Sequence, residues 1–454
     1  MGCLSAQGRF SPGIQPFVSV DSPVVALTHV RVIDGTGAAP VADQTIVIVG
    51  GKIQSVGGAV PDSARVMDLS GHTVIPGLIG MHQHLFYPSG GGVPIYNEHA
   101  FSFPRLYLAC GITTMRTAGS LEPYTDLNLK ASIDAGRMPG PKMLVTGPYL
   151  EGAGAFTPQM HELNDAEDAR RTVEYWVSEG VTSFKAYMHI TRAELAAAIK
   201  AAHEHGIKVT GHLCSIGFRE AAELGIDNLE HGLVVDTEFV PGKKPDQCPA
   251  QTETFATFRE LDVSSAPVQD TIRELVRRNV AITSTLAVFE ASSSDRPPLA
   301  QRVLDAMTHE ASVNYLSSRA RGATADRLGL VRKEMEFERA FVKAGGLLIA
   351  GADPTGNGGA LAGFADQRNL ELLVEAGFTG VEAIQIYTSN AARFLGNDLI
   401  GTIAAGKQAD LVVIQGDPST RIADVEKVKL VFKDGVGYDS AKLIDSVRAS
   451  VGLH

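Results

Sequence analysis

The chain has 454 residues, of which 44% are hydrophobic and 20% are charged, and its formal net charge is −11 at pH 7. This length exceeds what one hydrophobic core usually supports, so we expect a large domain and a smaller one. The negative charge argues against a nucleic-acid surface, and no apolar run is long enough to span a bilayer.

The cysteines and the N-terminus say little about the compartment. Without pairing or metal-type spacing, the cysteines are expected to be free thiols rather than a disulfide scaffold: Cys3, Cys110, Cys214 and Cys248. Residues 1–23 are polar and contain proline and glycine, so we expect an irregular leader. The sequence is compatible with a cytoplasmic protein and with a periplasmic or secreted one from which a signal peptide was trimmed.

Both ends of the chain carry β-type sequence. Residues 24–76 contain short runs rich in valine and isoleucine, separated by Asp-Gly and Gly-Gly turns, and similar runs return over residues 398–440. This pattern predicts one small β-sandwich domain assembled from both termini, followed by a C-terminal tail over residues 441–454.

Residues 77–397 alternate short apolar runs with helical segments, which is typical of βαβ units. In the clearest unit, a strand from Val181 is followed by a helix that opens with the capping box Thr191–Glu194 and stops at Gly206. Eight such repeats predict a (β/α)₈ TIM-like barrel of the α/β class. Its strands are expected to end near His84, Arg116, Thr146, Tyr187, His212, His231, Ser284 and Asp353. Two long insertions, from Gly232 and from Leu286, are expected to form lids or substrate walls.

Several of these strands end in residues that bind metal ions. His82 and His84 share one face of a strand because side chains alternate along it. Lys185 is expected to point into the barrel, where its charge is costly unless it is paired or removed. Active sites of such barrels lie at the carboxyl ends of the strands. We therefore expect one metal centre to gather His82, His84, Lys185, His212, His231 and Asp353.

Two segments resemble motifs of the amidohydrolase superfamily of metal-dependent hydrolases: residues 76–84, from Pro-Gly-Leu-Ile-Gly to His-Gln-His, and Asn390-Ala391-Ala392 together with residues 401–411. The resemblance covers nearly the whole chain and is strongest to the branch similar to prolidases and imidazolonepropionases. It implies two divalent ions, most plausibly Zn²⁺. One would be held by His82, His84 and Asp353, the other by His212 and His231, and a carboxylated Lys185 would bridge them.

The sequence departs from the family pattern at three positions, none of which removes a ligand. Gly80 stands where an aspartate is frequent, and Ala352 and Pro354 flank the acid where Thr and Ser are common.

The expected mechanism assigns roles to four residues. Two cations lower the pKa of a shared water, and Asp353 would take its proton and pass it to the leaving group. Tyr187 and His189 are expected either to donate to the developing oxyanion or to form the pocket wall. Arg116 and Tyr187 are candidates for substrate binding, with an ion pair inside the barrel as the alternative for Arg116.

The main functional hypothesis is a binuclear hydrolase that cleaves a C–N amide bond in a dipeptide, an N-acyl amino acid or a related amide. The alternative is a mononuclear deaminase or cyclic-amide hydrolase acting on a heterocycle, although the His-x-x-Glu spacing of the deaminase branch is missing after His212 and His231. A barrel that lost its chemistry is a third possibility, which the intact ligand set disfavours. We expect a small-molecule amide or peptide substrate, no nucleic-acid partner, no membrane span and a homo-oligomer.

Overall fold

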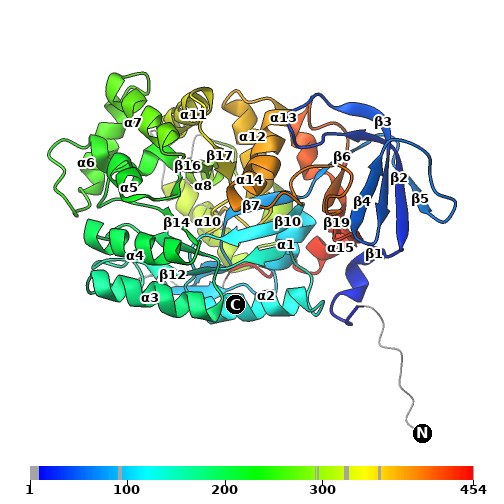
Figure 1. Ribbon diagram of the computed structural model, residues 1–454, viewed down its shortest axis with the longest axis horizontal. Helices are drawn as coiled ribbons and strands as arrows, with labels where there is room; N and C mark the ends of the chain where they lie inside the picture. Colours follow the sequence, from blue (N-terminus) through cyan, green and yellow to red (C-terminus); the bar gives the residue numbers. More distant parts are fainter. Residues whose placement is uncertain are drawn as a thin grey trace, which may run out of the picture.

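The computed structural model describes residues 10–89, 95–291, 293, 296–321, 327–355 and 359–452. Strands from both ends of the chain build one nine-stranded sheet at one end of the molecule (Figure 1). In spatial order its strands are β1 (Val18–Val20), β20 (Val436–Asp439), β19 (Val428–Lys433), β18 (Leu411–Gln415), β6 (His72–Pro76), β2 (Val24–Val32), β3 (Val41–Val49) and β4 (Lys52–Val56), and β5 (Arg65–Asp68) pairs with β2. The predicted β domain built from both termini is confirmed.

Alternation along β18 joins this sheet to the rest of the molecule. Leu411 and Val413 belong to the core inside the β domain, whereas Val412 between them belongs to the core of the large domain. Successive side chains of a strand point to opposite faces, so one strand serves two cores. Each of these fully buried side chains contributes about 1.5–3 kcal/mol of hydrophobic stabilisation.

The two ends of the chain are more ordered than expected. In the described part of the expected leader, Gln15–Phe17 form the short helix η1, and β1 pairs antiparallel with β20. At the other end, α15 spans Ser440–Asp445, and the backbone of Val451 pairs with Met307 of the large domain. Residues 1–9, with Gly2 and Cys3, lie outside the described residues.

Parallel strands in two sheets form the predicted barrel. The first sheet contains β7 (Leu78–Gln83), β10 (Ile112–Thr117) and β11 (Lys142–Leu144), and the second contains β12 (Thr146–Leu150), β13 (Ser183–Ala186), β14 (Lys208–Gly211), β15 (Asn228–Glu230), β16 (Ala281–Ser284) and β17 (Leu348–Ala350). The N–H of Asp353, after β17, donates to the carbonyl of His82 on β7 at 2.9 Å, which joins the last strand to the first.

The third barrel strand differs from the prediction. It does not end near Thr146 but is divided there: β11 pairs with β10, and β12 continues to Leu150 and pairs with β13. The hydroxyl of Thr146 bonds across the division to the carbonyl of Thr117 and to Ser183. The strand therefore delivers Tyr149 and Leu150, rather than Thr146, to its carboxyl end.

Helices surround the barrel (Figure 1): α1 (Phe103–Ala109), α2 (Pro123–Asp134), α3 (Ala166–Glu179), α4 (Arg192–Glu204), α5 (Phe218–Leu224), α7 (Ala266–Arg277), α11 (Arg327–Lys343), α12 (Phe364–Glu375), α13 (Gly380–Gln385), the π-turn η5 (Ile386–Asn390) and α14 (Ala391–Leu395). The capping box of α4 forms as predicted, with Thr191 and Glu194 as the reciprocal partners. None of the helices in the described ranges is both long and apolar enough to cross a bilayer.

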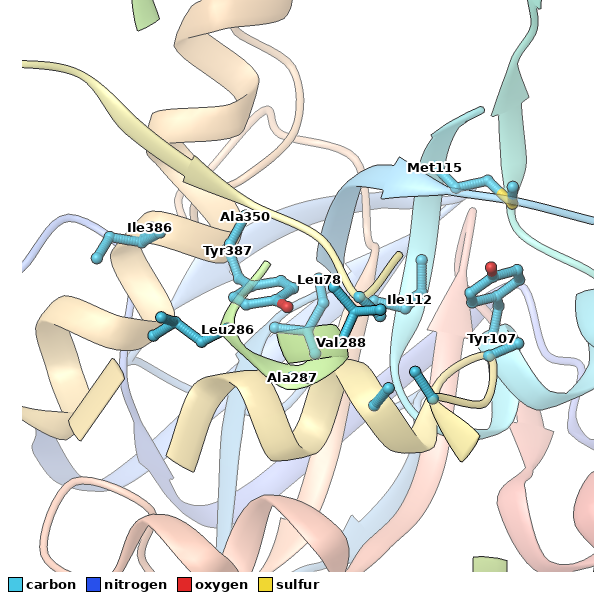
Figure 2. Close-up of a cluster of buried hydrophobic side chains, with 14 of the residues drawn as sticks. Leu78, Tyr107, Ile112, Met115, Leu286, Ala287, Val288, Ala350, Ile386 and Tyr387 are labelled. Carbon is cyan, nitrogen blue, oxygen red and sulfur yellow. The ribbon is translucent and has the colours of Figure 1, made fainter. Parts of the chain in front are cut away.

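Short elements fill the connections. These are the hairpin β8 (Phe86–Ser89) and β9 (Ile95–Glu98), then η2 (Gly232–Val235), η3 (Thr237–Phe239) and α6 (Gln251–Glu260) in the first long insertion, α8 (Leu286–Ala291), α9 (Gln301–Leu304) and α10 (His309–Arg321) in the second, and η6 (Ile422–Glu426) between β18 and β19. Figure 2 shows part of the buried hydrophobic cluster of the large domain, to which Leu286, Ala287 and Val288 of α8 belong.

The expectation of free thiols is wrong for two cysteines. Cys214, just after β14, forms a disulfide with Cys248 of the first long insertion, with the two Cα atoms 5.0 Å apart. Their separation of 34 positions in the sequence is not a recognisable spacing, because the pairing depends on how the insertion folds back over the barrel. Cys110 is free and buried.

Candidate metal centre

Two histidines and an aspartate meet where the first and last barrel strands end. One potential ligand atom from each of His82, His84 and Asp353 lies within 4.8 Å of the other two, and all three residues are buried. Oδ1 of Asp353 is 3.2 Å from Nε2 of His84 and 3.5 Å from Nε2 of His82. Asp353 reaches this position with a φ of +49°, a left-handed conformation that turns its side chain inward just beyond β17.

The other two predicted histidines complete the group. The rings of His212 and His231 have centroids 4.4 Å apart, and the ring of His231 lies 4.6 Å from that of His82. Nδ1 of His231 is hydrogen-bonded to the hydroxyl of Thr285 at 2.7 Å. Its Nε2 is buried and has no hydrogen-bond partner among the described residues. An imidazole held at one nitrogen, with the other free in a buried site, is the arrangement of a metal-binding histidine.

Lys185 lies inside the barrel, as expected. It is almost fully buried, and its Nζ is 3.0 Å from Nε2 of His82. The rings of Tyr149 and Tyr187 are near this amine, with their centroids 5.6 and 5.7 Å from Nζ. Burial lowers the pKa of Lys185 to about 8, so its amine loses its proton more readily than an exposed lysine does.

Arg116 has a role other than the expected contact with a substrate. Its Nη2 lies 2.7 Å from Oε1 of Glu230, and its Nε donates to the carbonyl of Met81 at 2.9 Å. Both charged groups are buried, and Arg116 is not among the residues that line the cavity described below. The structure therefore shows the alternative expected for Arg116, an ion pair inside the barrel.

Glu230 is the functional residue that the sequence did not reveal. Its Oε2 accepts a hydrogen bond from Nδ1 of His82 at 2.8 Å. Strand alternation would place Glu230 and the adjacent His231 on opposite faces, but His231 has a φ of +70°, and both side chains turn into the barrel. Burial would raise the pKa of Glu230, but the positive charge of Arg116 and the hydrogen bond from His82 hold it well below its ordinary value, so this carboxylate is ionised.

The protonation states suit a divalent cation. Burial lowers the pKa of His84 to about 4 and that of His212 to about 3, and it also holds the pKa of His231 well below 6.5. Burial alone would raise the pKa of Asp353, but its interactions with His82 and His84 hold it well below 3.8. Neutral imidazoles and an ionised carboxylate are the forms that ligate metals, so these residues fit a metal ion.

Tyr187 and His189, the two remaining predicted residues, lie in different surroundings in the structure. Tyr187 lies at the centre, with its ring 4.9 Å from that of His212. The backbone N–H of His189 donates to Oε1 of Glu151 at 2.6 Å, and its Nδ1 lies 3.5 Å from Oε2 of the same carboxylate. His189 is not among the residues that line the cavity described below, so its contact with an oxyanion stays a prediction.

A cavity of about 570 Å³ opens over the metal centre. His84, Lys185, His212, His231 and Asp353 lie at its floor. Its walls are made largely of apolar and aromatic residues, among them Phe86, Tyr96, Tyr149, Phe156, Tyr187, Val234, Val235, Phe255, Val288, Phe289 and Leu330. The first long insertion contributes to these walls, as expected of a substrate wall.

Comparison with solved structures supports the fold over almost the full chain. A candidate prolidase from Bifidobacterium longum is 25% identical, with a TM-score of 0.66 over 95% of this chain and 100% of that one. A Xaa-Pro dipeptidase with bound methionine is 20% identical, with a TM-score of 0.69 over 92% of this chain and 100% of that one. Bottromycin amidohydrolase is also 20% identical, with a TM-score of 0.72 over 97% of this chain and 93% of that one.

Sequence comparison places residues 73–436 in a known family. A dihydroorotase from Lactobacillus leichmannii is 27% identical over 190 residues, which is 41% of this chain and 37% of that protein. The chain thus matches little more than a third of the length of this curated relative. The model of the Amidohydrolase family matches residues 73–436, which include both segments that resemble amidohydrolase motifs and every predicted metal ligand. The chain therefore belongs to the Amidohydrolase family.

Proposed function

We propose that this chain hydrolyses an amide bond with two divalent ions, most plausibly Zn²⁺, held in the centre described above. His82, His84 and Asp353 would hold one ion, His212 and His231 the second, and Lys185, converted to a carbamate, would bridge them. The observation that carries the proposal is the position of Lys185, whose Nζ is buried 3.0 Å from Nε2 of His82. A buried ammonium beside four imidazoles is unfavourable, and a carbamate replaces that charge with an anionic ligand.

In this proposal Asp353 and Tyr187 have different roles in the reaction. When bound, the ions supply Lewis acidity for the carbonyl and lower the pKa of water. Asp353, ionised at the floor of the cavity, would accept the proton from the attacking water and return it to the leaving nitrogen. Burial raises the pKa of Tyr187 well above 10, so its hydroxyl stays protonated and can donate to the carbonyl oxygen.

Metal analysis of the purified protein tests this proposal. We expect about two divalent ions per chain and loss of amide hydrolysis on chelation, with recovery when Zn²⁺ is returned. His84→Ala and His212→Ala, one from each half of the centre, should each lower the metal content. Hydrolysis indifferent to chelators would contradict the proposal, and one ion per chain with deamination of a heterocycle would favour the alternative.

A further inference from the structure

One wall of the cavity is a continuous row of aromatic rings. Phe86 contacts Tyr96, Tyr96 contacts Phe156, and Phe156 contacts Tyr187, with centroids 5.2, 5.8 and 5.6 Å apart. Tyr149 continues the row, 4.8 Å from Tyr187 and stacked on the ring of His84 at 6.3 Å. These rings come from the β8–β9 hairpin, from β12 and the segment after it, and from the residue after β13, so three parts of the chain build one apolar surface.

The insertions build the opposite wall. The first contributes Val234, Val235 and, from α6, Phe255, while the second contributes Val288 and Phe289 of α8. The ring of Phe289 lies edge-on to that of His231, with centroids 5.6 Å apart, so this wall also reaches the metal centre.

Two links fix α6 over the cavity. The Cys214–Cys248 disulfide ties the chain just before α6 to the end of β14, and both cysteines line the cavity. Asp246, two residues before Cys248, accepts hydrogen bonds from the backbone N–H and the guanidinium of Arg192 at 2.8–3.1 Å. A wall held in this way keeps its shape without substrate, which lowers the entropy lost on binding.

The described part of the lining holds few charges, and these belong to the metal centre. Lys185, Asp353 and the imidazoles lie at the floor, and the wall side chains carry no formal charge. The phenols of Tyr96, Tyr149 and Tyr187 are neutral near pH 7, because a tyrosine ordinarily ionises near pH 10. A carboxylate or ammonium placed against these walls would lose its hydration without gaining a partner.

From these observations we infer that the substrate is a neutral amide with bulky apolar groups, at least one of them aromatic, rather than a free dipeptide or an N-acyl amino acid with an ionised carboxylate. This inference rests on the proposed function and narrows its substrate class. A volume of about 570 Å³ is that of a site for a drug-sized molecule. The walls would supply apolar area and ring contacts, each aromatic pair adding about 0.5–1.5 kcal/mol beyond burial.

Three matched compounds test the inference on the Zn²⁺-loaded protein. They are N-phenylacetyl-phenylalanine amide, the same compound with a free carboxylate in place of the terminal amide, and N-acetyl-alanine amide. We expect kcat/KM for the neutral aromatic amide to exceed those of the other two by at least about tenfold, the discrimination that an apolar pocket and an unpaired buried charge supply. Equal values, or a preference for the carboxylate, would overturn the inference while leaving amide hydrolysis intact.

Variants locate the preference in the wall. Phe255→Ala should lower kcat/KM for the aromatic amide about tenfold or more and leave that for N-acetyl-alanine amide nearly unchanged. Phe255→Leu keeps an apolar side chain and serves if the alanine variant does not fold. Phe101→Ala, at an exposed phenylalanine outside the cavity, is the matched control and should change neither value. An unchanged substrate preference in both Phe255 variants would contradict the assigned role of α6.

Calorimetry with the same compounds separates the two ideas. Binding of the neutral aromatic amide without cleavage of any amide would support the apolar specificity and contradict the proposed hydrolysis. Cleavage of the amides with tighter binding of the carboxylate compound would support the proposed hydrolysis and contradict the apolar specificity.

Discussion

Nδ1 of His82 donates to Oε2 of Glu230 at 2.8 Å, and this bond leaves Nε2 of His82 facing Asp353 and Lys185. The other oxygen of Glu230 is paired with Arg116 at 2.7 Å. All three side chains are buried, so the row Arg116–Glu230–His82 fixes the tautomer and orientation of His82, a proposed metal ligand, from inside the barrel.

Removing the charge of Glu230 should weaken metal binding. We expect Glu230→Gln to lower metal affinity by about 10–100-fold, the usual effect of losing the partner of a ligating histidine. Competition against a chelator of known affinity measures it. Wild-type affinity in this variant would show that Glu230 does not orient His82.

Arg116 provides the control that separates folding from metal binding. Arg116→Met leaves Glu230 buried without its partner and should cost about 3–5 kcal/mol in the free energy of unfolding. The double variant Arg116→Met/Glu230→Gln should regain most of that stability in denaturant unfolding but not the metal affinity. Recovery of both quantities would assign Glu230 a purely structural role.

Asp353 combines the roles of ligand and proton carrier, which one substitution separates. Asp353→Asn keeps the shape and one acceptor oxygen but cannot take a proton. We expect the variant to retain substantial metal while kcat falls by about 10²–10⁴, the scale of a lost general base, with a much smaller change in KM. Normal turnover with full metal content would leave Asp353 as a ligand only.

The bridge assigned to Lys185 predicts chemical rescue. Lys185→Ala should lose one of the two ions and nearly all activity, and short carboxylic acids should restore part of both because they supply the missing anionic oxygens. Lys200→Ala, at a lysine whose side chain is 81% exposed, is the matched control and should behave as wild type. Wild-type metal content in Lys185→Ala would exclude the bridge.

Glu338, on α11, predicts how stability changes with pH. Burial raises its pKa from 4.5 to about 8, and the nearby Ser284 offsets this only in part. Because the unfolded chain releases this proton at lower pH than the folded protein does, the stability contributed by Glu338 is full below pH 4.5 and is lost as the pH rises toward 8.

Glu338→Gln removes this dependence. The free energy of unfolding of this variant, minus that of the wild type, should increase by about 1–3 kcal/mol between pH 5 and about 8. Glu336→Gln, at an exposed position of the same helix, should show no such trend. A constant difference between Glu338→Gln and wild type across this range would contradict the raised pKa.

The sequence alone was enough for the barrel, for the β domain built from both termini and for the six candidate ligands. Strand alternation and the repeating βαβ rhythm are local properties, and parallel strands bring their carboxyl ends to one edge. His82 and His84 could therefore be assigned to one face, and His212, His231 and Asp353 to the same end, before any contact was known.

Only the tertiary structure decided which side chains meet across the chain. Arg116 and Glu230 are 114 residues apart, and His231 can turn inward beside Glu230 because it takes a left-handed conformation that no strand pattern indicates. Cys214 and Cys248 pair because the first insertion folds back over β14, and His189 is drawn to Glu151 instead of to the cavity. Local periodicity determines which face a residue occupies, whereas these partnerships depend on backbone geometry and on contacts between distant segments, which form only when the whole barrel closes.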